Sequence, residues 1–273
     1  MRLRVSHQTT YRYASPANTI TQILRMRPRG HEGQFVVDWR IELDRDARLQ
    51  VATDAFGNIV HSFTLAGPLA ELTISAIGDV ETEDTHGVIR QQLERFPASI
   101  FLRETHLTRS DSALRAFAEE AAGNHVAEPL SRLHDLNAAV FEKLRFNAGG
   151  TDAATTAAEA FKAGHGVCQD YAHVFISAAR HLSFPARYVG GYLHREGVAL
   201  QEAGHGWAEA YVADLGWVAF DPANGISATA DYLRVAVGLD YLGAAPIRGA
   251  RLGGGDETMS VAIRVDDVGV AIA

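Results

Sequence analysis

A single cysteine, Cys168, follows the glycine-containing segment Gly164-His165-Gly166-Val167 at the predicted start of a helix. The unpaired N–H groups and the positive end of the helix dipole at such a position stabilise a thiolate and can donate to an oxyanion. These features are typical of a nucleophile. A free cysteine is also commonly a small buried apolar residue, so this local pattern leaves both interpretations open.

A thiolate nucleophile needs a general base that can later protonate the leaving group, and histidine does both near neutral pH. Among the twelve histidines, His205 lies between Gly204 and Gly206 at the predicted start of a strand. Asp221 ends the next predicted strand and could orient the imidazole of His205. The order cysteine, histidine, aspartate on a helix start, a strand start and an adjacent strand end predicts a Cys168–His205–Asp221 catalytic triad.

Four further residues are candidates for the cleft around the cysteine. Gln169 and Asp170 follow it directly, although an acidic residue in the first turn of a helix also stabilises that helix by itself. Trp207 could shield the thiol and the imidazole from water as well as fill the core. The N–H of the cysteine is one expected oxyanion donor, and the loop that begins at Asn147 is a candidate for the second.

A metal site formed by Cys168 with His165, His173 and His181 is not expected. On a helix that starts at the cysteine, His173 and His181 lie roughly 140° and 220° around the axis from it, at about 100° per residue. These side chains would not converge on one ion. We therefore expect no metal ligands here.

The first part of the chain has the two-residue period of β-strands. From Arg2 to about Thr82, apolar residues alternate with polar ones, and the turn-forming segment Asp54-Ala55-Phe56-Gly57-Asn58 separates two such runs. Several short strands with turns between them predict an antiparallel β-sandwich. We assign this domain to residues 1–85 and a linker without sustained period to residues 86–107.

The rest of the chain, residues 108–273, starts with a helical period. Helices are expected from Ser110 or Asp111 to Ala122, from Pro129, after the capping box at Thr156, and from near Cys168. The second helix should bury Leu133, Leu136, Val140, Phe141 and Leu144. The last should bury Tyr171, Phe175, Ala178, Ala179 and Leu182, with Gln169, Asp170, His173, Ser177 and Arg180 lying elsewhere.

Strands follow these helices, which makes the whole chain α+β. They are expected over residues 186–193, 205–213 and 217–220, with a last strand over residues 261–265 after the flexible turn Gly253-Gly254-Gly255. We assign that last strand to the second domain, with the candidate catalytic residues.

The segments around the three candidate catalytic residues resemble the bacterial transglutaminase-like superfamily, a branch of the papain-like cysteine proteases. The resemblance spans nearly the whole chain. In the second domain it is carried by Gly166-Val167-Cys168-Gln169-Asp170-Tyr171, Pro185-Ala186-Arg187-Tyr188-Val189-Gly190-Gly191-Tyr192, His205-Gly206-Trp207 and Gly216-Trp217-Val218-Ala219-Phe220-Asp221-Pro222; in the first by Tyr11-Arg12-Tyr13, Arg27-Pro28-Arg29 and Asp54-Ala55-Phe56-Gly57-Asn58.

This resemblance implies a papain-like fold with Cys168 as nucleophile, His205 as acid and base, and Asp221 as the orienting carboxylate. It implies acyl-enzyme chemistry on an amide, with no metal or organic cofactor. Proteins of the peptide-ligase-like ATP-grasp kind, encoded beside such genes in some lineages, are implied as possible partners. The sequence departs from the family where Gly206 replaces a usual Ala before Trp207, and where Leu239, Gly243 and Ala244 replace a usual Arg and an Asp-Val pair.

Composition excludes several other functions. The net charge is −8 and Lys and Arg form no dense stripe, so we expect neither nucleic-acid binding nor polybasic membrane docking. One cysteine allows no intrachain disulfide. No window approaches 18 consecutive apolar residues and the first residues form no signal-peptide pattern, so we expect a cytoplasmic protein with no membrane association.

The sequence thus favours a cysteine protease or amidase that acts on peptide or isopeptide bonds of a peptide or protein substrate through a thioester. Transfer of a glutamine acyl group to an amine is the alternative with the same intermediate, and the lack of a calcium-loop pattern favours hydrolysis. A third alternative, from another class, is a non-catalytic binding or assembly module that uses the β-sandwich as its recognition surface.

Overall fold

A six-stranded antiparallel sheet forms one end of the protein in the computed structural model, which describes residues 1–123, 128–198 and 200–269. The strand order is β13-β1-β4-β2, with β14 on β1 and β3 on β4. The strands are β1 (Arg2–Arg27), β2 (Gln34–Leu43), β3 (Gln50–Thr53), β4 (Ile59–Thr82), β13 (Ile247–Gly253) and β14 (Glu257–Asp267). The expected antiparallel β architecture of the N-terminal region is confirmed.

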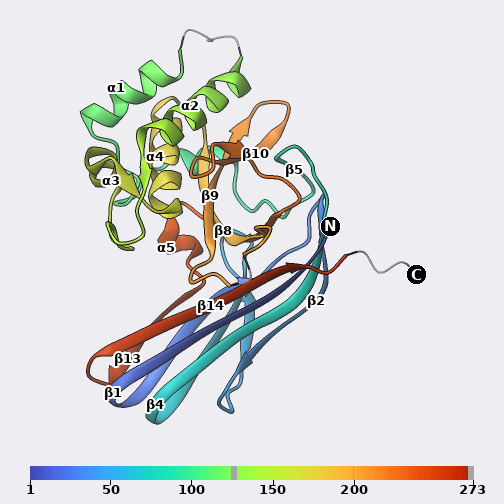
Figure 1. The fold of residues 1–273 in the computed structure, drawn as a ribbon, viewed down its shortest axis with the longest axis vertical. Coiled ribbons are helices and arrows are strands. Elements are labelled where there is room, and N and C mark those ends of the chain that lie inside the picture. The colour runs from blue at the N-terminus through green and yellow to red at the C-terminus, as the bar shows by residue number, and fades with distance from the viewer. Residues whose placement is uncertain (124–127, 199, 270–273) are drawn as a thin grey trace.

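The two long strands of this sheet change partners at a corner, where the ribbons double back in Figure 1. Residues 3–13 of β1 pair with β14, and residues 17–24 pair with β13. Pro16 lies at the corner of β1 and has no N–H for the ladder. Gly67 lies opposite in β4, where a Cβ would overlap the carbonyl oxygen of Ala17. These two residues permit the close approach that folds the sheet.

The C-terminal strands differ from expectation, because we assigned the segment 261–265 to the domain that holds the candidate triad. In the structure, β14 and β13 pair with the edge of β1 instead. At the turn from β13 to β14, Gly253, Gly254 and Gly255 all have positive φ, from 60° to 96°. Local period predicts a strand but not its partner, and an unpaired edge of β1 can accept a strand from anywhere in the chain. The chain therefore returns to its first sheet.

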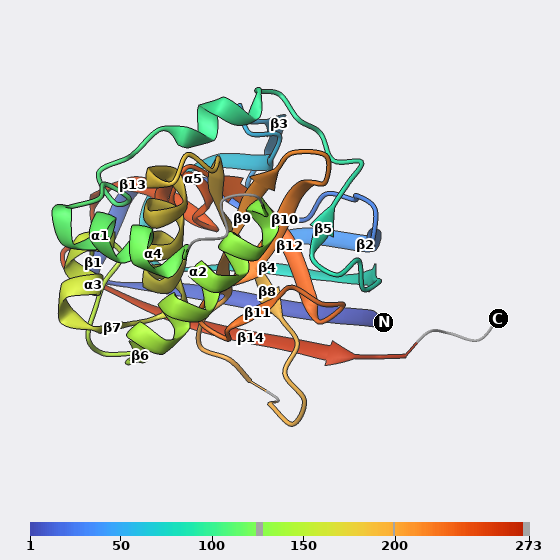
Figure 2. The same cartoon turned by 90° about the horizontal axis from the view of Figure 1, so that it is seen from above.

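A second antiparallel sheet has the order β11-β10-β9-β8-β12, with β5 on β10. Its strands are β5 (Val88–Ile89), β8 (Ala186–Leu193), β9 (His205–Val212), β10 (Gly216–Asp221), β11 (Ile226–Ser227) and β12 (Tyr232–Gly238); β6 (Arg145–Phe146) and β7 (His165–Gly166) form a separate parallel pair. The helices are η1 (Ala98–Leu102), α1 (Ser112–Ala121), α2 (Pro129–Lys143), α3 (Ala157–Ala163), α4 (Cys168–His181) and α5 (Tyr241–Ala244). Figures 1 and 2 show α1, α3 and α4 together on one side of β9.

The predicted helix starts are confirmed by their caps. Asp111 accepts a hydrogen bond from the N–H of Leu114 at the start of α1. Thr156 and Glu159 form a capping box on α3, which ends at Gly164 with φ of 70°. Pro129 opens α2. On that helix Phe141, which was expected to be buried, is 46% exposed.

Helix α4 is buried on all sides, whereas the sequence predicted an apolar face only. Residues 169–180 are all buried, because α1, α2 and α3 pack on one side of the helix and β8 and β9 on the other. Its polar residues are therefore enclosed in the core. Arg180, for example, donates to the carbonyl oxygens of Phe101, Ala186 and Leu239 and to the hydroxyl of Thr108.

Residues 86–107, which were expected to be a linker, pack closely on the second sheet. Strand β5 pairs with β10, and the ring of Phe101 in η1 meets that of Trp217 edge-on at 5.0 Å. The segment also carries Glu94, which pairs with Arg187. The described residues contain no helix that is long and apolar enough to cross a membrane.

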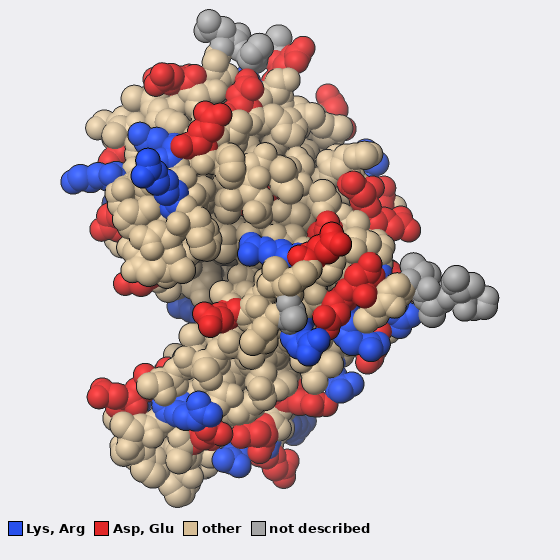
Figure 3. All heavy atoms as spheres, in the orientation of Figure 1, with Lys and Arg blue, Asp and Glu red and all other residues tan. Residues whose placement is uncertain are grey.

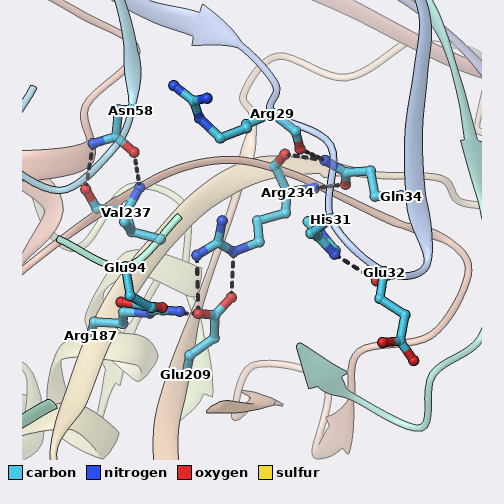
Figure 4. Close-up of polar contacts among 10 residues, drawn as sticks. All are labelled: Arg29, His31, Glu32, Gln34, Asn58, Glu94, Arg187, Glu209, Arg234 and Val237. Atoms are coloured by element: carbon cyan, nitrogen blue, oxygen red, sulfur yellow. Dashed lines mark hydrogen bonds and ion pairs between the residues drawn. The ribbon is translucent and has the colours of Figure 1, made fainter. Parts of the chain in front are cut away.

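A buried ionic cluster ties three strands of the second sheet together (Figure 4). Glu209 of β9 is fully buried and accepts from Arg187 of β8 and Arg234 of β12, each at 2.6 Å. Burial disfavours its charge, but the two guanidinium groups outweigh burial and lower the pKa of Glu209 to about 2. Arg187 also lies 3.7 Å from the centroid of the Trp217 ring, a cation–π contact.

The first sheet is attached to the same region of the second (Figure 4). Asn58 both donates to and accepts from the backbone of Val237, at 2.8 Å in each case. Gln34 makes the same double contact with the backbone of Arg234. Because both amides are buried, these four bonds fix how β12 lies against the first sheet.

Loss of one partner of Glu209 should destabilise the protein strongly. We expect Arg234→Met to lower the free energy of unfolding by about 3 kcal/mol, since it leaves a buried charge only partly compensated. Urea unfolding followed by tryptophan fluorescence measures this change. The control Arg12→Met removes an exposed pair with Glu71 and should cost less than about 1 kcal/mol; equal losses in the two variants would contradict the assigned role of the cluster.

Candidate active site

Cys168 is the first residue of α4, after Val167, and is partly exposed. Its N–H is among the first of the helix, which have no intrahelical acceptor. Asp170, two residues later, reaches back and accepts from the N–H of Val167 at 2.8 Å. The helix start is thereby held in place while the N–H of the cysteine stays available to an incoming group.

His205 and Asp221 lie beside each other because β9 begins where the antiparallel strand β10 ends. The Nε2 atom of His205 is 2.6 Å from Oδ2 of Asp221. This contact leaves Nδ1 as the free ring nitrogen of His205. Cys168 and His205 line the same cleft, so the structure places the three residues that the sequence singled out in one region.

Asp221 is completely buried and is held by several donors. Its Oδ2 accepts from the hydroxyl of Tyr232 and the side-chain amide of Asn224, each at 2.6 Å, and its Oδ1 accepts from the N–H of Ala223 at 3.0 Å. Burial would raise the pKa of Asp221, but His205 and these donors lower it. The carboxylate is therefore ionised and fixed in orientation. No local pattern in the sequence marks Tyr232 or Asn224 as a partner of Asp221.

The charge of His205 follows from its surroundings. Burial alone would lower the pKa of His205, but the hydrogen bonds to Asp221 and Cys168, together with their charges, raise it to about 9. The folded-state pKa is thus above the ordinary value of about 6.5. This pairing stabilises the fold fully below about pH 6.5, and the stabilisation is lost as the pH rises through about 9.

The other four predicted site residues occupy different positions around Cys168 and His205. Gln169 lines the cleft at Cys168, and its amide is 3.5 Å from the carbonyl oxygen of Asp152. Trp207 is buried, with its ring stacked at 6.0 Å from that of His205. Asp170 is buried and serves the helix start and Thr151. Asn147 is exposed, accepts from the N–H of Gly149, and lies between the lining residues Phe146 and Ala148 without lining the cleft itself.

A cleft of about 620 Å³ opens at Cys168 and His205. One wall comes from β8 and the loops beside it, and another from β1 of the first sheet through His7 and Arg25. The two sheets are also joined there by a 2.8 Å contact between Nδ1 of His7 and the hydroxyl of Tyr192. No local pattern in the sequence marks β1 as a wall of the cleft. The N-terminal sheet therefore forms part of the site.

Two further histidines of the cysteine region, His173 and His181, have separate partners. His173 accepts from the N–H of Tyr241 at 3.0 Å, and His181 pairs with Glu119 at 2.8 Å. Within the described residues, no three His, Cys, Asp or Glu side chains are grouped in a way that could hold a metal ion.

Gly206 stands where the resembled family usually has alanine, and the structure explains this difference. A Cβ at position 206 would overlap the hydroxyl of Tyr188 and come within 2.8 Å of Cζ of its ring. The glycine therefore makes room beside His205 for a tyrosine from the neighbouring strand.

Comparison with known proteins identifies both halves of the chain. Residues 3–81 match the model of the bacterial transglutaminase-like N-terminal region, and residues 115–222 match that of the transglutaminase-like superfamily. An uncharacterized protein of Mycobacterium leprae is 30% identical over 279 residues, which cover 97% of this chain and 98% of that protein. An uncharacterized protein of Mycobacterium bovis is 28% identical over 272 residues, 91% of this chain and 87% of that protein.

Among solved structures, the "Putative Cysteine Protease" of Cytophaga hutchinsonii superimposes with a TM-score of 0.80. The two chains are 21% identical, and the match covers 100% of this chain and 92% of the other. At this identity the likeness shows the fold. The expected transglutaminase-like core fold and the strand-rich N-terminal region that precedes it are confirmed.

The raised pKa of His205 can be measured by its NMR titration. We expect an apparent pKa of about 9 in the native protein and a lower value in Asp221→Asn, because the substitution removes the negative charge that favours the imidazolium. The matched control Asp231→Asn removes the partner of His194 and should leave the titration of His205 unchanged. A native pKa near 6.5 would refute the described coupling.

Proposed function

Because this chain belongs to the transglutaminase-like superfamily, we propose that it is a cysteine protease or amidase in which Cys168, His205 and Asp221 form the catalytic triad. The observation that supports this most strongly is the 2.6 Å contact between His205 and Asp221 in a cleft that also contains the cysteine. A buried carboxylate that orients an imidazole beside a thiol is the arrangement that activates a cysteine nucleophile.

In the proposed reaction, the thiolate of Cys168 attacks the carbonyl carbon of an amide, and the carbonyl oxygen becomes an oxyanion. His205 then gives its Nδ1 proton to the departing nitrogen, the C–N bond breaks, and an amine leaves behind a thioester. Water attacks the thioester while His205 takes its proton. The C–S bond breaks, so a carboxylic acid is released and the thiolate–imidazolium pair is restored.

The cleft suits a peptide or protein substrate. Its volume lies within the usual range for ligand sites, and it extends from the triad to β1. On the face drawn in Figure 3, acidic and basic side chains are interspersed rather than gathered by sign. This distribution favours recognition by shape and backbone contacts over attraction of a highly charged partner.

Alkylation of the thiol tests whether the triad is active. Near pH 6 an ordinary cysteine is almost entirely protonated, whereas a thiolate paired with His205 reacts at once. We expect Cys168 to react with iodoacetamide at pH 6 at least about tenfold faster than free cysteine, and His205→Ala to abolish the difference.

Two variants serve as controls for this measurement. Cys168→Ser should take up no label, since the chain has one cysteine. His181→Ala removes a histidine that pairs with Glu119 outside the cleft and should react like the native protein. A native rate equal to that of free cysteine would contradict the proposed activity and favour a non-catalytic binding module.

The product decides between hydrolysis and acyl transfer. We expect mass spectrometry of a glutamine-containing peptide, incubated with the enzyme and a primary amine, to show hydrolysis of an amide bond. A mass gain equal to the amine minus ammonia would instead identify a protein-glutamine acyltransferase.

The cytoplasmic location and the ATP-grasp partners stay predictions, which cell fractionation and co-purification would test.

A further inference from the structure

Tyr188 is a buried polar residue in the cleft that the proposed mechanism has not used. It lies on β8 and is 3% exposed. Two other tyrosines near the site have clear partners, since Tyr192 contacts His7 and Tyr232 donates to Asp221. For the hydroxyl of Tyr188, the described residues provide no hydrogen-bond partner, and the residue lines the cleft together with Cys168.

The position of this hydroxyl is set by Gly206. A Cβ there would overlap it, so the hydroxyl lies against the backbone between His205 and Trp207. Burial, and then the nearby negative charge of Cys168, raise the pKa of Tyr188 well above its usual value. At every working pH the phenol therefore keeps its proton and can act only as a donor toward an anion.

The ring of Tyr188 is held firmly on both sides. Its centroid is 5.4 Å from that of His173 on α4, the helix that begins with Cys168. On another side it meets the ring of Tyr241 edge-on at 5.9 Å. Strand β8 is an inner strand, paired with both β9 and β12. A donor fixed in this way needs no reorganisation when charge develops beside it, which is the condition for electrostatic catalysis.

Attack by Cys168 creates an oxyanion, which needs donors in addition to the N–H of the cysteine. The candidate from the sequence, Asn147, is exposed and is not among the residues that line the cleft. We propose that the hydroxyl of Tyr188 donates a hydrogen bond to the oxyanion of the tetrahedral intermediate. This assignment rests on the proposed function, because it requires acyl transfer to Cys168.

Two reagents that attack the same thiol can separate this role from others. Acylation by p-nitrophenyl acetate passes through a tetrahedral oxyanion, whereas alkylation by iodoacetamide is a direct displacement at carbon and forms none. We expect Tyr188→Phe to slow the release of p-nitrophenolate in the acylation burst by about 10- to 100-fold, toward the range seen when one oxyanion donor is removed. The rate of alkylation should stay within about twofold of the native rate.

The control is Tyr211→Phe, which makes the same chemical change on β9, where Tyr211 packs on Trp217 away from the residues that line the cleft. In Tyr211→Phe, the rate of acylation and the rate of alkylation should both equal those of the native protein. An unchanged acylation rate in Tyr188→Phe would overturn the inference, and so would an equal loss in both reactions, because the hydroxyl would then act on the thiol itself. A native thiol that is not activated toward iodoacetamide would refute the proposed function, and this inference with it.

Discussion

The buried carboxylate of Glu209 is the interaction on which the rest of the structure depends. A charge with no exposure to water is tolerated only when opposite charges and donors surround it. Arg187 of β8 and Arg234 of β12 supply these charges and donors, and Glu94 also pairs with Arg187. The order of three strands and the position of residues 86–107 are therefore linked to a single acidic side chain.

This cluster also sets the register from which the candidate active site follows. Arg187 is paired with Glu209, and Gly191 with His205, along the same two strands. A slip of one residue would turn every side chain to the opposite face of the sheet. Between β8 and β9, such a slip would remove Tyr188 from the position next to Gly206. The ion pairs of Glu209 thus help to fix the positions of cleft residues that lie several residues away on the same strands.

The first sheet contributes to the site through its shape rather than through catalytic groups. Its long strands bring His7 and Arg25 to the wall of the cleft, and Asn58 and Gln34 hold β12 by its backbone. β13 and β14 cover the edge of β1, so strands from the N-terminal and C-terminal parts of the sequence belong to this sheet. A substrate in the cleft would contact both parts of the protein. The N-terminal region therefore forms one wall of the cleft.

The sequence by itself predicted most of the helices and strands and singled out the three residues of the proposed centre, because these predictions depend on local features. The caps at Asp111 and Thr156 specify helix starts, and the glycines around Cys168 and His205 mark backbone that approaches a reacting group. Only the tertiary structure decided which strands pair, which polar residues of α4 are buried, and that Tyr188 and β1 face the cysteine. Pairing and burial depend on contacts between segments far apart in the chain, and the two-residue and 3.6-residue periods contain no information about those contacts.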